Sequence, residues 1–163
     1  MDGVGDAEGT LRVLKELGDR RVWIPLQRPE RLELPLRHIW DEAGDTVGYV
    51  LIASIGERGK PAKLLFDTGN HGLYVIERIA SKRGFTSLGE ATTFGGAGSR
   101  KHRVERGLFP VFALGDLRYA DALVTSTHEE VEATGRFHGL LGLSALAGYR
   151  VTLDLRKKRI LLE

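Results

Sequence analysis

The chain has 163 residues, of which 42% are hydrophobic and 28% are charged, and its formal net charge is +2. This length and composition are typical of one soluble globular domain, and the small net charge gives no reason to expect a nucleic-acid partner. Cysteine is absent, which excludes disulfides, thiolate metal sites and a cysteine nucleophile. No apolar run reaches transmembrane length, and the acidic, Gly-rich start does not resemble a signal peptide. We therefore expect a soluble chain, and its compartment stays unknown.

Residues 1–30 are predicted to be an N-terminal extension or linker, and residues 31–163 the folded domain. A short helix is expected over residues 10–17, with Thr10 as its N-cap and Gly18 as its end. Residues 21–36 hold three of the five prolines. Because proline cannot donate to a sheet ladder, this segment is predicted to be extended, at a sheet edge or in a linker. The sequence leaves open whether residues 1–30 are a linker, a propeptide or a dimer arm.

The rest of the chain is predicted to be mostly β. The patterns indicate a hairpin of strands over 34–40 and 47–56, followed by strands over 62–66 and 74–76. A helical turn is expected over 77–84, ended by Gly84. Residues 91–113 predict a second hairpin with a Gly-rich tip, and residues 117–127 a further strand. A short apolar run over 136–142, a helical turn over 144–148 and two strands around the charged turn 156–158 complete the chain.

The stretch LLFDTG, residues 64–69, places a carboxylate directly after an apolar strand. Such a group is costly to bury without a partner. Asp-Thr-Gly alone is more often a turn than a functional site. Here apolar residues lie on both sides, with Val75 and Ile76 following, so we expect the turn at the inner edge of the core.

With three further segments, this stretch resembles the retropepsin-like, or retroviral-type, aspartic peptidases in their bacterial single-lobe form. The resemblance spans Leu34 to Glu163 and rests on four features in the same order. These are LLFDTG (64–69), GGAGS (95–99), GLLG (139–142) and YRVTLDLRKKRILL (149–162). It implies an all-β fold, with a closed β-barrel lobe, a Gly-rich flap hairpin and one or two short helices.

Aspartic peptidases use two carboxylates that share one proton around a water molecule. The resemblance implies that Asp67 is the catalytic carboxylate and that Thr68 donates its hydroxyl across a two-fold axis. Gly69 would leave room for two such loops to meet and would adopt a positive φ. A second loop, with a structural role near the site, would pack behind this turn and consists of Gly139, Leu140, Leu141 and Gly142.

The resemblance also implies that the hairpin tip is a flap that closes over a substrate peptide. Its substrate-binding residues would be Phe94, Gly95, Gly96, Ala97 and Gly98. The alternative is a flexible hairpin that contacts nothing. A phosphate-binding loop is disfavoured, because the spacing fits neither the Walker pattern nor GxGxxG.

The sequence departs from the family pattern at Asn70, His71 and Ser144. The family usually has alanine or serine in place of Asn70, and often an acidic or amide residue in place of Ser144. We expect Asn70 to lie near the paired carboxylates, where its NH₂ group would lower their apparent pKa. The five histidines lack metal-ligand spacing, so neither a metal nor another cofactor is expected.

No second Asp-Thr-Gly or Asp-Ser-Gly triplet occurs, so the chain supplies one carboxylate where two are needed. A symmetric copy of the chain would supply the second. The sequence therefore predicts a homodimeric aspartic endopeptidase that cleaves extended peptide or protein substrates. Two alternatives stay open, one lobe of a larger two-lobe peptidase and a non-catalytic dimerisation or peptide-binding module. Cleavage specificity and pH optimum do not follow from the sequence.

Overall fold

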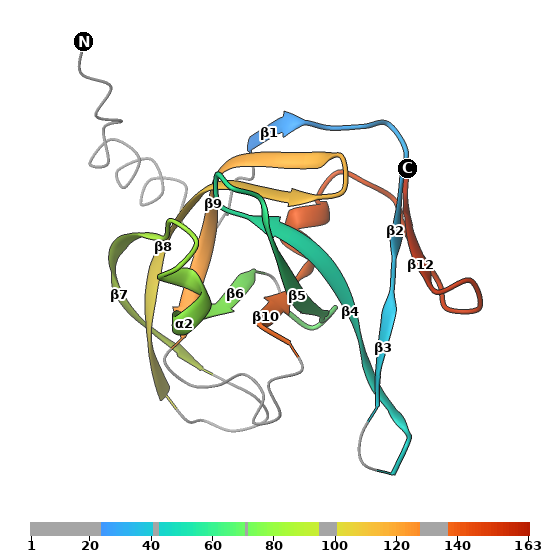
Figure 1. Cartoon of the computed structure of the whole chain (residues 1–163), viewed down its shortest axis with the longest axis horizontal. Coiled ribbons are helices and arrows are strands. Elements are labelled where there is room, and N and C mark those ends of the chain that lie inside the picture. The colour runs from blue at the N-terminus through green and yellow to red at the C-terminus, as the bar shows by residue number, and fades with distance from the viewer. Residues whose placement is uncertain (1–23, 41–42, 71, 95–100, 128–136) are drawn as a thin grey trace.

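The computed structural model describes residues 24–40, 43–70, 72–94, 101–127 and 137–163. Within these ranges the chain is built mainly from strands, which confirms the expected all-β fold (Figure 1). The predicted helix over 10–17 and the Gly-rich tip over 95–100 lie outside the described residues. None of the helices in the described ranges has the length and apolar character needed to span a bilayer.

The strands are β1 (Ile24–Gln27), β2 (Leu32–Pro35), β3 (Arg37–Trp40), β4 (Thr46–Ile55), β5 (Lys60–Phe66), β6 (Leu73–Ile76), β7 (Thr86–Phe94), β8 (Lys101–Leu114), β9 (Leu117–Thr127), β10 (Gly139–Leu141), β11 (Val151–Asp154) and β12 (Arg159–Leu162). The helices in the described ranges are short and comprise α2 (Glu77–Ala80) and the 3₁₀ helix η1 (Leu143–Leu146).

Six strands pair in a circuit around the main hydrophobic core. The pairings run from β4 to β5, β10, β6, β9 and β8, and from β8 back to β4. The last ladder is short, with Ser54 opposite Ala113 and Ile55 opposite Phe112. Among the fully buried side chains are Leu64, Phe109 and Leu141, which come from three strands of this circuit. The core therefore lies directly behind the ends of β5 and β10.

The segment 34–40, predicted as one strand, is two strands in two different sheets. β2 joins β12 and β11 in a three-stranded sheet, whereas β3 pairs with β4. The change occurs after Pro35, which has no N–H to continue the β2 ladder. The next residue, Leu36, is buried and donates its N–H to the Lys158 carbonyl at 2.8 Å.

The proline-rich entry segment forms a sheet edge, as its prolines predict. β1 pairs with β9 and includes Pro25. The sheet thus includes residues 24–27, which fall in the segment predicted as extension or linker. The predicted 91–113 hairpin is longer than expected, because β7 begins at Thr86. Gly89, with φ of +125°, is accommodated by an irregularity in the β7–β8 register and does not end the strand.

β10 lies between two strands that are neighbours in the sequence. It pairs in parallel with β5 and antiparallel with β6. Just before it, His138 donates its N–H to the Lys63 carbonyl at 2.7 Å, and its Nδ1 accepts the Lys63 N–H at 3.1 Å. Gly139 then faces Val75 across the antiparallel ladder. A Cβ on Gly139 would lie 2.0 Å from the Tyr74 carbonyl oxygen, so only glycine fits at this approach.

Gly139→Ala should destabilise the fold by at least about 2 kcal/mol, because the added methyl group collides with backbone that has no room to move. Urea unfolding of both proteins measures the difference. Gly44→Ala is the control, since its turn has φ of +87° and no atom within 4 Å of the added Cβ. Gly44→Ala should lower the free energy of unfolding by only about 1 kcal/mol, the cost of placing alanine at a positive φ. Equal losses for the two variants would contradict the close-approach argument.

The pKa of His138 lies below its usual 6.5, through burial first and then through Lys63, Arg83 and Arg78. The folded state therefore binds this proton less readily than the unfolded chain does. It follows that stability falls as pH drops below 6.5 and recovers as pH rises. The neutral ring is also the form in which Nδ1 accepts the Lys63 N–H.

His138→Asn should make the free energy of unfolding less dependent on pH between about 7 and 5, because the asparagine oxygen accepts the same N–H without titrating. Urea titrations at several pH values measure this slope. The ring signal of His138, followed by NMR, should titrate with a midpoint below 6.5 in the wild type. A midpoint at or above that value would refute the assignment.

Candidate active site

The Asp67 turn begins where two parallel strands end together. Phe66 and Leu141 are paired as the last residues of β5 and β10. The next hydrogen bond runs from the Asp67 N–H to the Leu141 carbonyl, at 3.0 Å. The backbone of Asp67 is therefore fixed by the sheet, although its side chain lies beyond the strand.

The turn also orients the carboxylate. Oδ1 of Asp67 accepts the N–H of Gly69 at 2.9 Å, and the Asp67 carbonyl accepts the N–H of Asn70 at 3.2 Å. Asp67 is half-buried, whereas Thr68 and Gly69 are exposed. Among the described residues, the second carboxylate oxygen has no hydrogen-bond partner. One oxygen is thus held by the backbone of the turn itself.

Gly69 differs from the sequence-based expectation in one respect. It is not among the glycines with positive φ, so its backbone conformation does not demand glycine. A Cβ at this position would lie 3.3 Å from Oδ1 of Asp67, which is closer than an ordinary contact. Within one chain, therefore, the reason for glycine here is space beside the carboxylate.

The structure brings the second predicted loop against the turn. Gly142 donates its N–H to the Gly72 carbonyl at 2.8 Å, and Leu143 donates to the Asn70 carbonyl at 3.1 Å. Together with the Asp67–Leu141 bond, these contacts attach the segment 139–143 to both sides of the 67–72 turn. The two segments that the sequence singled out separately are one hydrogen-bonded unit.

Asn70 has a partner other than the one the sequence suggested. Its Oδ1 accepts the N–H of Gly72, and its Nδ2 donates to the Gly72 carbonyl, both at 3.2 Å. The amide closes the turn locally, so the expectation that it donates to the carboxylates has no support here. His71 lies outside the described residues. The Ser144 hydroxyl is buried and has no partner among the described residues.

The predicted flap is described only in its two strands. β7 and β8 form an antiparallel hairpin whose last pair is Phe94 opposite Lys101. Gly95, Gly96, Ala97 and Gly98 lie outside the described residues. The assignment of this hairpin as a flap stays a prediction.

An apolar groove lies beside the Asp67 turn and was not anticipated from the sequence. Its volume is about 450 Å³, and its lining consists of Phe66, Thr68, Leu143, Leu146, Ala147, Gly148, Tyr149, Val151 and Leu153. Leu143 and Leu153 are 37% and 44% exposed, which is high for leucine. The sequence pattern does not reveal this, because Leu153 and Leu155 of the terminal hairpin are exposed whereas Leu162 is buried.

A buried tyrosine holds one wall of this groove in place. Tyr119 of β9 donates its hydroxyl to the Ala145 carbonyl of η1. Burial, aided by the nearby Tyr149, raises the pKa of Tyr119 to about 12, so the donor keeps its proton. Among the described residues, no three His, Asp or Glu side chains gather as a metal site.

No family model matches the chain, and no curated protein matches it in sequence. A solved structure, a retropepsin-like aspartic protease from Rickettsia conorii, is similar to it in fold, with a TM-score of 0.55. The similarity covers 86% of this chain and 94% of that chain, at 16% sequence identity. The sheet topology and this likeness together show that the chain has a retropepsin-like fold.

Proposed function

We propose that the chain is an aspartic endopeptidase and that Asp67 from each chain of a homodimer forms the catalytic pair. The observation that carries this proposal is the Asp67 carboxylate at the joint end of β5 and β10. One of its oxygens is held by Gly69, and the other has no partner among the described residues. On a retropepsin-like fold, an aspartate oriented in this way matches the requirement for a carboxylate that works on water.

The chemistry follows from two such carboxylates facing each other. Like charges held close together cannot both ionise, so the pair shares one proton. The ionised member accepts a proton from the bound water, whose oxygen attacks the peptide carbonyl carbon. The protonated member donates to the carbonyl oxygen, which stabilises the negative charge that develops there. Transfer of a proton to the amide nitrogen then allows the C–N bond to break.

A second copy of the chain accounts for the exposed leucines. The groove that Leu143 and Leu153 line also includes Thr68, which directly follows the catalytic aspartate. In a two-fold dimer, the same surface of each chain meets its counterpart on the axis. Such a contact would bury this groove, bring the two Asp67 turns together and let Thr68 donate across the interface.

The substrates are extended peptides held by backbone hydrogen bonds, with apolar side chains in flanking pockets. The likeness in fold covers nearly the whole of the Rickettsia conorii chain, which supports an enzyme built from single-lobe chains. The two-lobe alternative places the partner carboxylate in the same polypeptide and predicts activity without dimerisation. A non-catalytic binding module would have no need for an oriented, half-buried carboxylate.

Mixing wild type with Asp67→Asn at constant total concentration tests the shared pair. Asparagine cannot take the water's proton, so a mixed dimer should be inactive. An equal mixture should retain about a quarter of the wild-type activity, because random pairing leaves that fraction of fully wild-type dimers. The rate of peptide cleavage is measured directly after mixing the two preassembled dimers and again after their chains have exchanged partners.

Retention of about half the activity would mean that each chain acts alone, contrary to the shared pair. Urea unfolding of Asp67→Asn provides the folding control, since the variant removes a charge and leaves the backbone bonds of the turn in place. Wild-type activity in Asp67→Asn alone would refute the catalytic assignment.

Leu153→Asp should weaken dimerisation by at least about tenfold, because it places a charge in an apolar contact. Sedimentation at several concentrations measures the dimer dissociation constant, and specific activity should fall in parallel. Leu26→Asp is the matched control, since Leu26 is 61% exposed on β1 and does not line the groove. An equal effect of both substitutions, or none from either, would place the interface elsewhere.

A further inference from the structure

A second and larger cavity lies away from the catalytic turn. Its volume is about 570 Å³, within the usual range for small-molecule sites. It is lined by the β4–β5 turn, the turn after α2, the middle of β8 and Asp121 of β9. Lys60 at its rim and Asp67 lie at opposite ends of β5, roughly 20 Å apart by the rise of an extended strand.

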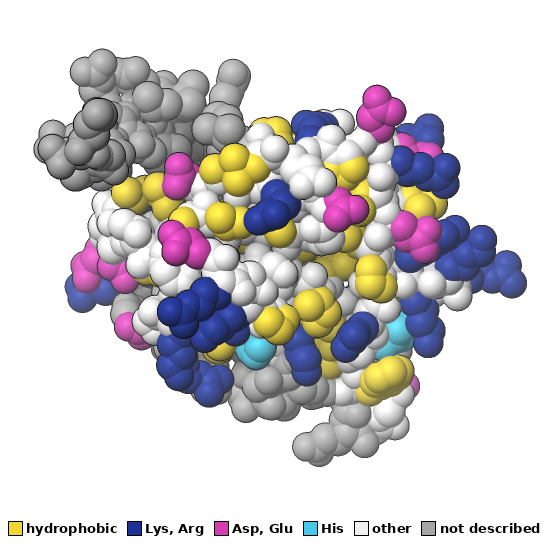
Figure 2. Space-filling model, turned by 45° about the horizontal axis from the view of Figure 1, so that its top comes forward, with side chains coloured by type: hydrophobic (Ala, Val, Ile, Leu, Met, Phe, Trp, Pro, Cys, Tyr) yellow, Lys and Arg dark blue, Asp and Glu magenta, His cyan; other side chains and the backbone are white. Residues whose placement is uncertain are grey.

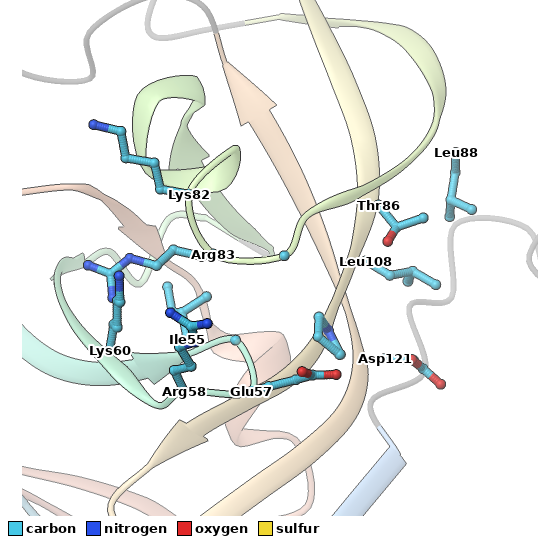
Figure 3. A pocket seen from close by; sticks show the side chains of 13 residues that line it. Ile55, Glu57, Arg58, Lys60, Lys82, Arg83, Thr86, Leu88, Leu108 and Asp121 are labelled. Atoms are coloured by element: carbon cyan, nitrogen blue, oxygen red, sulfur yellow. The ribbon is translucent and has the colours of Figure 1, made fainter.

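The cavity carries an excess of positive charge. Four cationic side chains line it, with two carboxylates, and these six are Arg58, Lys60, Lys82, Arg83, Glu57 and Asp121. In the view of Figure 3, Lys60 and Arg83 lie on one side of the cavity, whereas Glu57 and Asp121 lie on the other. Within the described ranges, no ion pair joins any of the four cations to a carboxylate. Lys and Arg side chains also gather in compact groups on the face shown in Figure 2.

Arg83 is the best-placed of these cations. Its Nη2 donates to the Pro61 carbonyl at 3.1 Å, which fixes the guanidinium. Its Nη1 is buried and has no partner among the described residues. An unpaired buried donor is costly, and on a cationic group it favours an anion as its partner. The positive field reaches His138 as well, whose pKa Arg83 helps to lower.

The walls around Arg83 are preformed. A Cβ on Gly56 would lie 2.4 Å from the Arg83 carbonyl oxygen, so the two turns touch through backbone. Gly84, with φ of +77°, turns the chain into contact range of Pro110. Beyond the charged residues, the lining is mostly apolar and includes Leu88, Leu108 and Pro110. The cavity therefore offers a charged end and an apolar side.

We propose that this cavity binds a phosphate monoester of an apolar or aromatic group. The four cations against two carboxylates leave a surplus of two positive charges, which matches a phosphate group of charge near −2 better than a single carboxylate. The fixed Arg83 guanidinium supplies positive charge to the phosphate end, Lys60 adds a donor from the same lining, and the organic group lies against Leu108 and Pro110. This site is independent of the peptidase chemistry.

Phenyl phosphate, benzoate and inorganic phosphate are the probes, titrated into the full chain and followed by NMR at the amides of Arg83, Gly84 and Leu108. Phenyl phosphate should bind at least about tenfold more tightly than either of the others, because only it satisfies both ends of the cavity. Equal binding of benzoate would overturn the assignment to phosphate. Equal binding of inorganic phosphate would overturn the apolar half of the site, and unchanged amide signals at saturation would overturn the site itself.

Lys60→Gln should weaken phenyl phosphate binding by about tenfold, through the loss of one charge-assisted hydrogen bond. This variant complements Arg83→Gln, which also loses the bond to Pro61 and so carries a cost in folding. The matched control for charge is Arg156→Gln, an exposed cation in the turn between β11 and β12. Equal weakening by Lys60→Gln and Arg156→Gln would mean general charge attraction and would refute the site.

Discussion

The parallel ladder between β5 and β10 is the constraint on which the rest of the molecule depends. It joins residues that lie far apart in the chain, and its last hydrogen bond, from Asp67 to Leu141, fixes the start of the Asp67 turn. The turn then aims its carboxylate through Gly69, and the segment after β10 closes around Asn70 and Gly72. If the ladder shifted by one residue, the backbone bonds of the turn and the orientation of the carboxylate would be lost together.

The strands were largely predictable because their apolar runs are bounded by glycine and polar turns. β9 matches its predicted range, and β4 and β5 differ from theirs by one or two residues. The division of residues 34–40 into two strands was missed because the alternation of apolar and polar residues identifies a strand but does not show which sheet the strand joins. The start of β7 was missed because Gly89 indicates a break in the sequence, whereas the ladder accommodates it as an irregularity.

The resemblance implied that the second loop packs behind the aspartate turn, and the structure adds the hydrogen bonds that make this contact. The aspartate triplet and the glycine pair around Leu140 and Leu141 are visible in the sequence, but the hydrogen bonds that join them are tertiary. The partner of Asn70 was missed although it is local, since an asparagine side chain can bond the backbone two residues on, as Asn70 does with Gly72. The exposed groove and the basic cavity are surfaces assembled from several turns, and neither leaves a local pattern.

The position of β10 also orders events during synthesis of the chain. β5 and β6 emerge from the ribosome well before β10, which pairs with both of them. Contacts over such long separations form late, because the loop between them must first be closed. Until residue 141 is available, Asp67 lacks the backbone partner that fixes its turn. A nascent or truncated chain therefore carries the aspartate without its ordered setting, and the Asp67 turn is completed only when the C-terminal quarter of the chain has been added.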